Sequence, residues 1–257
     1  MYEIISALLS DRKGGEIFVC FGFWHICCLF IAVAAAVWSI SFLRRKPGFV
    51  RQRALDLLIS CAFGLYIADF FLMPFAYGKI DVEKLPFHVC TAMCLMCFLS
   101  RHTRFWAPYR SRFAVLGLVS NLVYLIYPAG VMWHQVHPVS YRVIQTLGFH
   151  GVMSVYGLLA LVFEEPPQKK THRRDLAVIT GMTLWALLGN LLYGSSAEGH
   201  PFNFNWFFVL RDPFYLLPEA IAPWIMPPLN VALFFAAEQA VYGLCRLVQK
   251  KLVPENT

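Results

Sequence analysis

The stretch from Ile17 to Leu43, IFVCFGFWHICCLFIAVAAAVWSISFL, decides the fold class because it holds no Asp, Glu, Lys or Arg. About 20 apolar residues in a helix cross the hydrocarbon core of a bilayer, so this run predicts a transmembrane helix. The whole chain has the same character: 58% of its 257 residues are hydrophobic, 14% are charged, and the mean hydropathy is +0.57. This composition excludes the usual soluble domains and disordered chains.

Similar apolar runs recur along the chain with no long polar segment between them. Unbroken runs near this length predict helices, whereas a membrane β-barrel would show shorter alternating segments. We therefore expect an all-α membrane protein with a single domain over residues 1–257, a bundle of about seven transmembrane helices. The predicted spans are residues 17–43, 54–77, 85–100, 113–130, 143–163, 176–196 and 215–245.

Two sequence features refine this expectation. The last span contains Pro218, Pro223, Pro227 and Pro228, and proline removes a backbone donor from a helix, so a kink or break is predicted near Pro227. Residues 1–16 are polar, and no small-residue cleavage site follows the first span, so no cleaved signal peptide is expected.

The basic residues predict how the bundle is oriented. Sixteen of the 22 Lys and Arg residues fall in alternate connections or the C-terminal end, within residues 44–53, 101–112, 169–174 and 246–251. Short cytoplasmic loops collect Lys and Arg, so we expect the amino terminus outside and the carboxyl terminus inside. The formal charge of +7 then reflects this bias and attraction to anionic lipid, and no nucleic-acid partner is expected. The compact chain suggests a bacterial cytoplasmic membrane.

Polar groups inside the predicted spans are the first candidates for a functional site, because burying them in a bilayer is costly. At about 1.5 Å per residue, five such groups fall roughly 6–12 Å below the outer ends of their spans. They are Cys90, His150, Asp69, Asn190 and Glu219. A thiol, an imidazole and two carboxylates are typical of nucleophilic catalysis. The alternative is that these groups only form hydrogen bonds between helices.

The other reactive residues have simpler interpretations. His25 is expected to be a buried polar contact, and His134 and His137 are expected to be surface residues rather than metal ligands. Cys94 and Cys97 form a CxxC pair without a soluble strand–helix context, which favours helix packing over redox chemistry. No lysine lies within a predicted span, so a retinal-type Schiff base is excluded.

The loop SSAEGHPFNFNWFFVLRDPF, residues 195–214, is more aromatic than a solvated loop should be. We expect it to fold back into the membrane interface or to plug the bundle. Asn203 and Asn205 would then either offer side-chain amides to a carbonyl or phosphate group of a substrate, or serve only as turn formers.

Four short motifs carry a resemblance to a known family. They are FGFWHI (residues 21–26), LPFHVC (residues 85–90), TLGFHGVM (residues 146–153), and GNLLYG (residues 189–194) followed by NFNWFF. The pattern resembles that of the YwaF-type integral membrane proteins, a family similar to the eukaryotic transmembrane protein 164 acyltransferases, over about residues 17–240. The resemblance implies transfer of a fatty acyl chain between lipids by a membrane-embedded cysteine and histidine, which fall on Cys90 and His150.

The residues themselves permit the same chemistry. A thiol in apolar surroundings needs a base, and His150 would take the proton of Cys90 while Asp69 or Glu219 orients the imidazole. Cys90 would attack a lipid ester and form an acyl-thioester, which a second lipid hydroxyl or water resolves. His88 is assigned to the beginning of the third span, as a headgroup or backbone contact. The expected substrate is a membrane phospholipid or lysophospholipid in the outer leaflet, with no cofactor and no metal.

Two other classes of function remain open. A lipid or small-molecule binding or transport protein would also have a proline-broken helix and a polar site within the bundle, although no internal repeat is present. A metal-dependent membrane hydrolase would need about three converging ligands, for which His88, His150 and Asp69 are the candidates, but no HxxxH or HxxE spacing supports it. The sequence does not indicate an oligomeric state.

Overall fold

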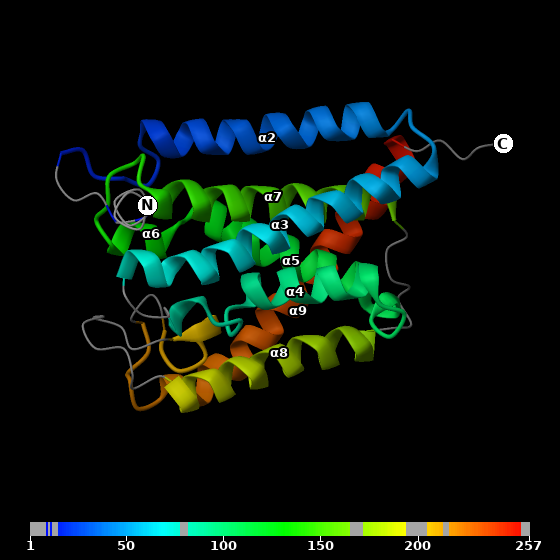
Figure 1. Cartoon of the computed structure of the whole chain (residues 1–257). Coiled ribbons are helices and arrows are strands. Elements are labelled where there is room, and N and C mark those ends of the chain that lie inside the picture. The colour runs from blue at the N-terminus through cyan, green and yellow to red at the C-terminus, as the bar shows by residue number, and fades with distance from the viewer. Residues whose placement is uncertain are drawn as a thin grey trace.

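The structure is a computed structural model of the chain, and it describes residues 9, 11, 15–77, 82–164, 172–193, 205–212 and 216–252. Over these residues the regular structure is entirely helical, which confirms the predicted fold class (Figure 1). The seven long helices are α2 (Phe23–Leu43), α3 (Gly48–Tyr77), α4 (Val89–His102), α5 (Arg110–Ile126), α7 (Tyr141–Phe163), α8 (His172–Tyr193) and α9 (Ala222–Leu252). The shorter elements are α6 (Ala129–Trp133) and the 3-10 turns η1 (Val82–Lys84), η2 (Ala107–Tyr109) and η4 (Trp206–Phe208).

Within the described part of the chain, five helical segments are long and apolar enough to cross a membrane. They are Phe23–Leu43, Gly48–Phe75, Ala107–Met132, Tyr141–Phe163 and His172–Tyr193. Helix α4 has 14 residues, which gives it a length of about 21 Å against a hydrocarbon core of ~30 Å. The chain is therefore an integral membrane protein by the length and composition of its helices, and α4 is too short to span the bilayer alone.

Helix α4 begins four residues later than predicted, at Val89 instead of Leu85. Pro86 has no backbone N–H and disfavours helical backbone at the residue before it, so the chain makes turns until His88. His88 precedes the helix with extended backbone, φ −71° and ψ 141°. Cys90 therefore lies in the first turn of α4, and the depth predicted for it, which assumes a helix from Leu85, does not hold.

Helix α9 also differs from the prediction. It begins at Ala222 instead of Tyr215, after a turn in which the N–H of Ala222 donates to the carbonyl of Pro218. The predicted break at Pro227 does not occur, because the helix continues to Leu252 with Pro227 and Pro228 inside it. The pair lies in the second turn, so the two missing donors affect only the amino-terminal part of a long helix.

The centre of the bundle is the contact between α5 and α7. Gly157 permits it, since a Cβ atom there would lie only 2.8 Å from the Cβ of Leu118. Helices α2 and α8 lie on opposite sides of this centre, with α3 and α4 between them (Figure 1). The outer face of α2 exposes Phe30, Ile31 and Trp38, as expected of a surface that contacts lipid tails.

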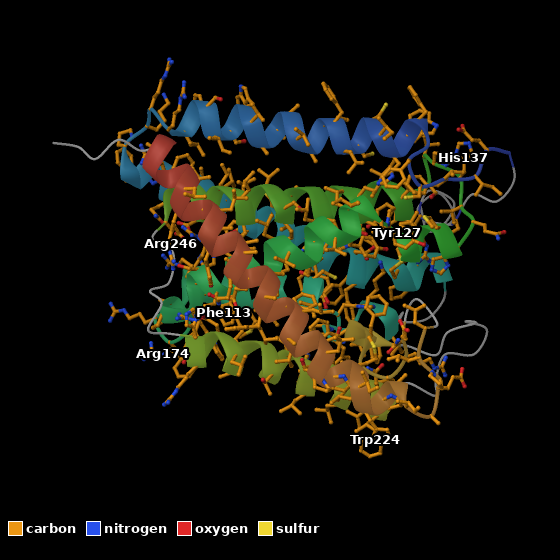
Figure 2. All side chains as sticks on the ribbon, turned by 180° about the vertical axis from the view of Figure 1, so that it is seen from behind. Phe113, Tyr127, His137, Arg174, Trp224 and Arg246 are labelled. Atoms are coloured by element: carbon orange, nitrogen blue, oxygen red, sulfur yellow. The ribbon has the colours of Figure 1, made fainter. Side chains whose placement is uncertain are left out.

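The bundle has two ends with different chemistry. Arg174 and Arg246 lie at one end, which also carries the α2–α3 and α4–α5 connections, and His137 lies at the other (Figure 2). We call these the basic end and the Cys90 end, because α4 begins and α8 ends at the latter. Which side of the membrane each end faces stays a prediction.

Candidate functional site

The LPFHVC motif forms the start of α4, and α8 holds it in place. The indole N–H of Trp185 donates to the carbonyl oxygen of Pro86 at 2.7 Å. The ring of Phe87 is buried, with its centroid 5.0 Å from that of Trp185 and 5.1 Å from that of Trp206. Gly189 makes room for it, since a Cβ atom there would lie 2.3 Å from the ring. The contacts of Pro86 and Phe87 thus fix the position at which α4 begins.

Cys90 is the second residue of α4 and carries a half-buried free thiol. The first N–H groups of a helix have no partner within the helix, and those of Cys90 and Thr91 interact with the sulfur. They offer stabilisation to a thiolate formed there, in opposition to the cost of burying its charge. Cys94 and Cys97, one and two turns further on, are free and fully buried, as expected of packing residues.

His150 lies near the middle of α7 and is 4% exposed. Its Nδ1 lies 2.7 Å from Oδ1 of Asn121 on α5. The ring of Tyr124, also on α5, stacks on the imidazole at 4.1 Å between centroids and 17° between planes. Helix α5 therefore fixes both the position and the plane of the imidazole.

Cys90 and His150 have one electrostatic neighbour in common, Lys84. The hydroxyl of Tyr66 donates to the carbonyl of Lys84 at 2.9 Å, and Tyr66 is also an electrostatic neighbour of Cys90. The Tyr66 ring lies 6.4 Å from that of Phe149, the residue before His150. Lys84 is therefore a common neighbour of the predicted nucleophile and the predicted base.

The carboxylates are arranged differently from the prediction. Asp69 is 2% exposed, and its Oδ2 lies 2.7 Å from Nζ of Lys84, so it forms an ion pair instead of orienting His150. Glu219 is exposed in the turn before α9. The residue on Nδ1 of His150 is the amide Asn121. The amide occupies the orienting position without adding a buried charge.

His88 lies at the start of α4, as predicted. It is half-buried, and its ring lies edge-on to Trp206 at 6.4 Å. Its carbonyl oxygen accepts hydrogen bonds from the N–H of Ala92 at 2.9 Å and the hydroxyl of Thr91 at 3.0 Å. Contact of its imidazole with a lipid headgroup stays a prediction.

Residues 205–212 of the aromatic loop pack against the bundle, whereas residues 195–204 and 213–214 lie outside the described residues. Trp206 is fully buried. Asn190 on α8 donates to the carbonyl of Trp206 at 3.1 Å and accepts from its N–H at 3.0 Å. Asn205 accepts from the N–H groups of Leu210 and Arg211. Both amides serve the loop backbone, and Asn203 lies outside the described residues.

We call residues 205–210 the Trp206 cap, because they cover the start of α4. Asn230 on α9 donates to the carbonyls of Phe207 and Phe208 at 2.7 and 3.1 Å. These two residues have φ values of 59° and 51°, in the left-handed region that non-glycine residues rarely adopt. Asn190 and Asn230 thus hold the cap in a backbone conformation that costs free energy.

Sequence reasoning missed two residues of the site. Asn121 lies nine residues from the predicted end of its span at Gly130, so the depth count that selected Asp69 applies to it as well. Lys84 lies one residue before the predicted third span, and a search confined to the spans passes over it. Their contacts, of Asn121 with His150 on α7 and of Lys84 with Asp69 on α3, depend on how the helices pack.

Two other histidines, His25 and His134, have partners of their own. His25 is fully buried, with Nδ1 accepting from the N–H of Phe21 and Nε2 lying 2.8 Å from the carbonyl of Leu125, so it is the predicted polar contact. Nε2 of His134 lies 3.2 Å from the guanidinium of Arg142. Within the residues that the structure describes, no three His, Cys, Asp or Glu side chains are arranged to hold a metal ion.

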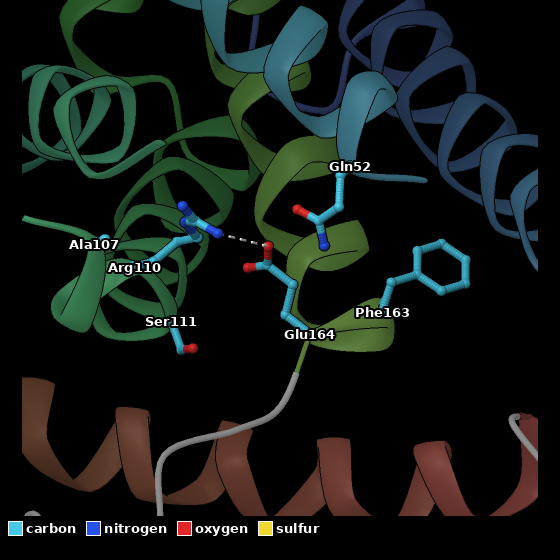
Figure 3. Close-up of a pocket in the computed structure, with 6 residues that line it drawn as sticks. All are labelled: Gln52, Ala107, Arg110, Ser111, Phe163 and Glu164. Carbon is cyan, nitrogen blue, oxygen red and sulfur yellow. Dashed lines mark ion pairs between the residues drawn. The ribbon is translucent and has the colours of Figure 1, made fainter. Parts of the chain in front are cut away.

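The basic end contains a pocket of about 330 Å³ beside a network of ion pairs (Figure 3). It is lined by Gln52, Ala107, Arg110, Ser111, Phe163 and Glu164. The buried guanidinium of Arg101 next to it bonds to Asp56 and Gln52 of α3 and, at 2.8 Å, to Glu164 at the end of α7. These groups tie α3, α4 and α7 together and lie at the opposite end from Cys90.

The sequence profile of the TMEM164 family matches residues 20–241. The chain belongs to the TMEM164 family. The matched region runs from just before α2 into α9 and therefore contains the whole Cys90 site of this family member. No curated protein and no solved structure matches the chain.

Proposed function

We propose that this TMEM164 family member is a membrane-embedded lipid acyltransferase that works through an acyl-thioester on Cys90. The observation that carries the proposal is that Cys90, at the start of α4, and His150, which Asn121 and Tyr124 hold in place, share Lys84 as an electrostatic neighbour. In nucleophilic catalysis by cysteine, an imidazole takes the proton of the thiol.

The steps balance without a cofactor. Nε2 of His150 takes the thiol proton, and the sulfur of Cys90 attacks the carbonyl carbon of a phospholipid ester. The ester C–O bond breaks, the departing lysolipid oxygen takes the proton from the imidazolium, and the acyl chain remains on sulfur. The hydroxyl of a second lysophospholipid then gives its proton to His150 and attacks the thioester, which returns the thiol.

The aromatic surroundings of the site support a lipid substrate. The Trp206 cap, Phe87 and Tyr193 surround the start of α4 with rings, so the site is lined by groups suited to the interfacial depth of a bilayer. Ester carbonyls of phospholipids lie at this boundary between headgroups and tails. A water-soluble acyl donor would have to reach a thiol beneath this cap.

The test is acyl exchange in liposomes that contain a phospholipid with a labelled acyl chain and an unlabelled lysophospholipid. Wild-type protein should produce the rearranged phospholipid, and Cys90→Ala and His150→Gln should each lose at least ~10³-fold of the rate, because a nucleophile and its base act as one unit. Cys61→Ala, at an exposed free thiol of α3, and Cys94→Ala, one turn along α4, should keep most of it. Full exchange by Cys90→Ala would leave lipid binding or transport as the better function.

The membrane side of the site is part of the proposal. The basic residues favour a Cys90 end that faces the outer leaflet of a bacterial cytoplasmic membrane. In intact cells a membrane-impermeant maleimide should label Gln135→Cys, an exposed position near His137, and should not label Arg174→Cys at the basic end, with wild type as background. The reverse pattern would move the substrate to the inner leaflet.

A further inference from the structure

We propose that Asn121 is a positioning residue that holds His150 in the Nδ1–H tautomer, so that Nε2 is the nitrogen that faces the chemistry of Cys90. The inference rests on the proposed function for its purpose, but its geometry is independent of it. Asn121 is fully buried, His150 is 4% exposed, and Oδ1 and Nδ1 lie 2.7 Å apart. Both groups are shielded from water, and a hydrogen bond is electrostatically stronger in such surroundings than in water.

The hydrogen-bond pattern fixes which way the amide points. Nδ2 of Asn121 lies 2.7 Å from the carbonyl oxygen of Gly117, one turn earlier on α5. A carbonyl can only accept, so the NH2 group of Asn121 must face Gly117 and its oxygen must face His150. That oxygen can only accept as well, so Nδ1 of His150 carries the hydrogen. A neutral imidazole has one N–H, and its lone pair is therefore on Nε2.

The ring plane is fixed by the same helix. Tyr124 follows Asn121 by three residues, a spacing that places both on one face of α5, and its ring stacks on the imidazole at 4.1 Å. The ring of Phe149 lies edge-on to the imidazole, with 5.1 Å between centroids and 78° between planes. Asn121 sets the tautomer and Tyr124 sets the plane, so Nε2 points in one direction before a substrate arrives. This preorganisation shortens the path from thiol to imidazole in the reactive geometry.

An amide suits this position better than the carboxylates that the sequence suggested. Asp69 is already paired with Lys84, and a second negative charge beside His150 would lack a partner. Asn121 accepts the Nδ1 hydrogen without adding charge. The arrangement of a cysteine at a helix start, a histidine and an asparagine occurs on unrelated folds that use a thiol nucleophile.

Three variants separate this role from simple packing. Asn121→Leu keeps the size and removes the acceptor, Asn121→Asp keeps an acceptor, and Ser120→Ala alters the same turn while leaving the bond to His150 intact. In the liposome assay Asn121→Leu should lose roughly 100-fold or more in kcat with little change in the KM for lysophospholipid, because a wrong tautomer affects the chemical step. The kcat of Asn121→Asp should be higher than that of Asn121→Leu, and the kcat of Ser120→Ala should be close to that of wild type.

The spectroscopic readout does not need activity. In nanodiscs with ¹⁵N-labelled histidine, the His150 signals, assigned by their loss in His150→Gln, should show a protonated Nδ1 and an unprotonated Nε2 in wild type. Asn121→Leu should convert these signals to the Nε2–H form or a mixture. A wild-type Nε2–H tautomer would overturn the inference even if Asn121→Leu fails to fold. Unchanged kcat in Asn121→Leu would also overturn it, whereas an active Cys90→Ala would overturn the proposed function and leave the tautomer assignment standing.

Discussion

The two ends of the bundle bury polar groups in different ways. At the basic end, Arg101 meets two carboxylates, and Arg112 on α5 pairs with Asp175 on α8. At the Cys90 end lie the half-buried thiol of Cys90 and the buried imidazole of His150, with the ion pair of Lys84 and Asp69 near them. Paired charges with satisfied bonds hold helices in place, whereas neutral groups with an available proton can react. The ion pairs of the basic end stabilise the fold, and the proposed reaction belongs to the Cys90 end.

The largest expected effect on stability belongs to the basic end. Arg101→Met should lower the free energy of unfolding by about 3 kcal/mol, the low end of the cost of breaking a buried pair, because Asp56 keeps contact with water. Unfolding in bicelles measures it. Acyl exchange per folded molecule should stay near wild type, and a protein that is fully stable but inactive would show that the two ends are not separate in function.

A smaller effect is expected where α8 holds the start of α4. Gly189→Ala pushes a methyl group into the ring of Phe87 and should cost about 1–3 kcal/mol of unfolding free energy. It should also reduce acyl exchange, since Cys90 follows Phe87 by three residues. The matched control is Gly181→Ala on the same helix, where a Cβ atom meets nothing within 4 Å, and it should be neutral or stabilising by ~0.5–1 kcal/mol. Equal behaviour of the two variants would remove the argument that packing fixes the start of α4.

The fold was largely predictable from the sequence, and the site was predictable only in part. Long apolar runs predict seven helices whatever their packing, but the boundaries of α4 and α9 depend on prolines whose effect varies with position. Cys90 and His150 are candidates because few reactive groups lie in the predicted spans. Their partners could not be assigned, because the pairing of Asp69 with Lys84 and of Asn121 with His150 joins different helices, and a single sequence does not give helix rotation.

The smallest expected effect is that of a substitution at Glu219. Glu219 was a candidate for orienting His150, and the structure exposes it in the turn before α9. Glu219→Gln should change the free energy of unfolding by less than about 0.5 kcal/mol and leave the pH dependence of acyl exchange unchanged. Loss of activity in this variant together with full activity in Asn121→Leu would return the orienting role to the carboxylate.

The central claim is that the Cys90 thiol carries the acyl chain, and intact-mass spectrometry tests it most directly. Wild-type protein incubated with phospholipid and no acceptor should gain the mass of one acyl chain, lose it in hydroxylamine, and transfer it when lysophospholipid is added. Cys90→Ala should never gain this mass, whereas Cys61→Ala should gain it as wild type does. An adduct that persists in Cys90→Ala, or a wild type that exchanges acyl chains without ever forming an adduct that survives rapid quenching, would contradict the account.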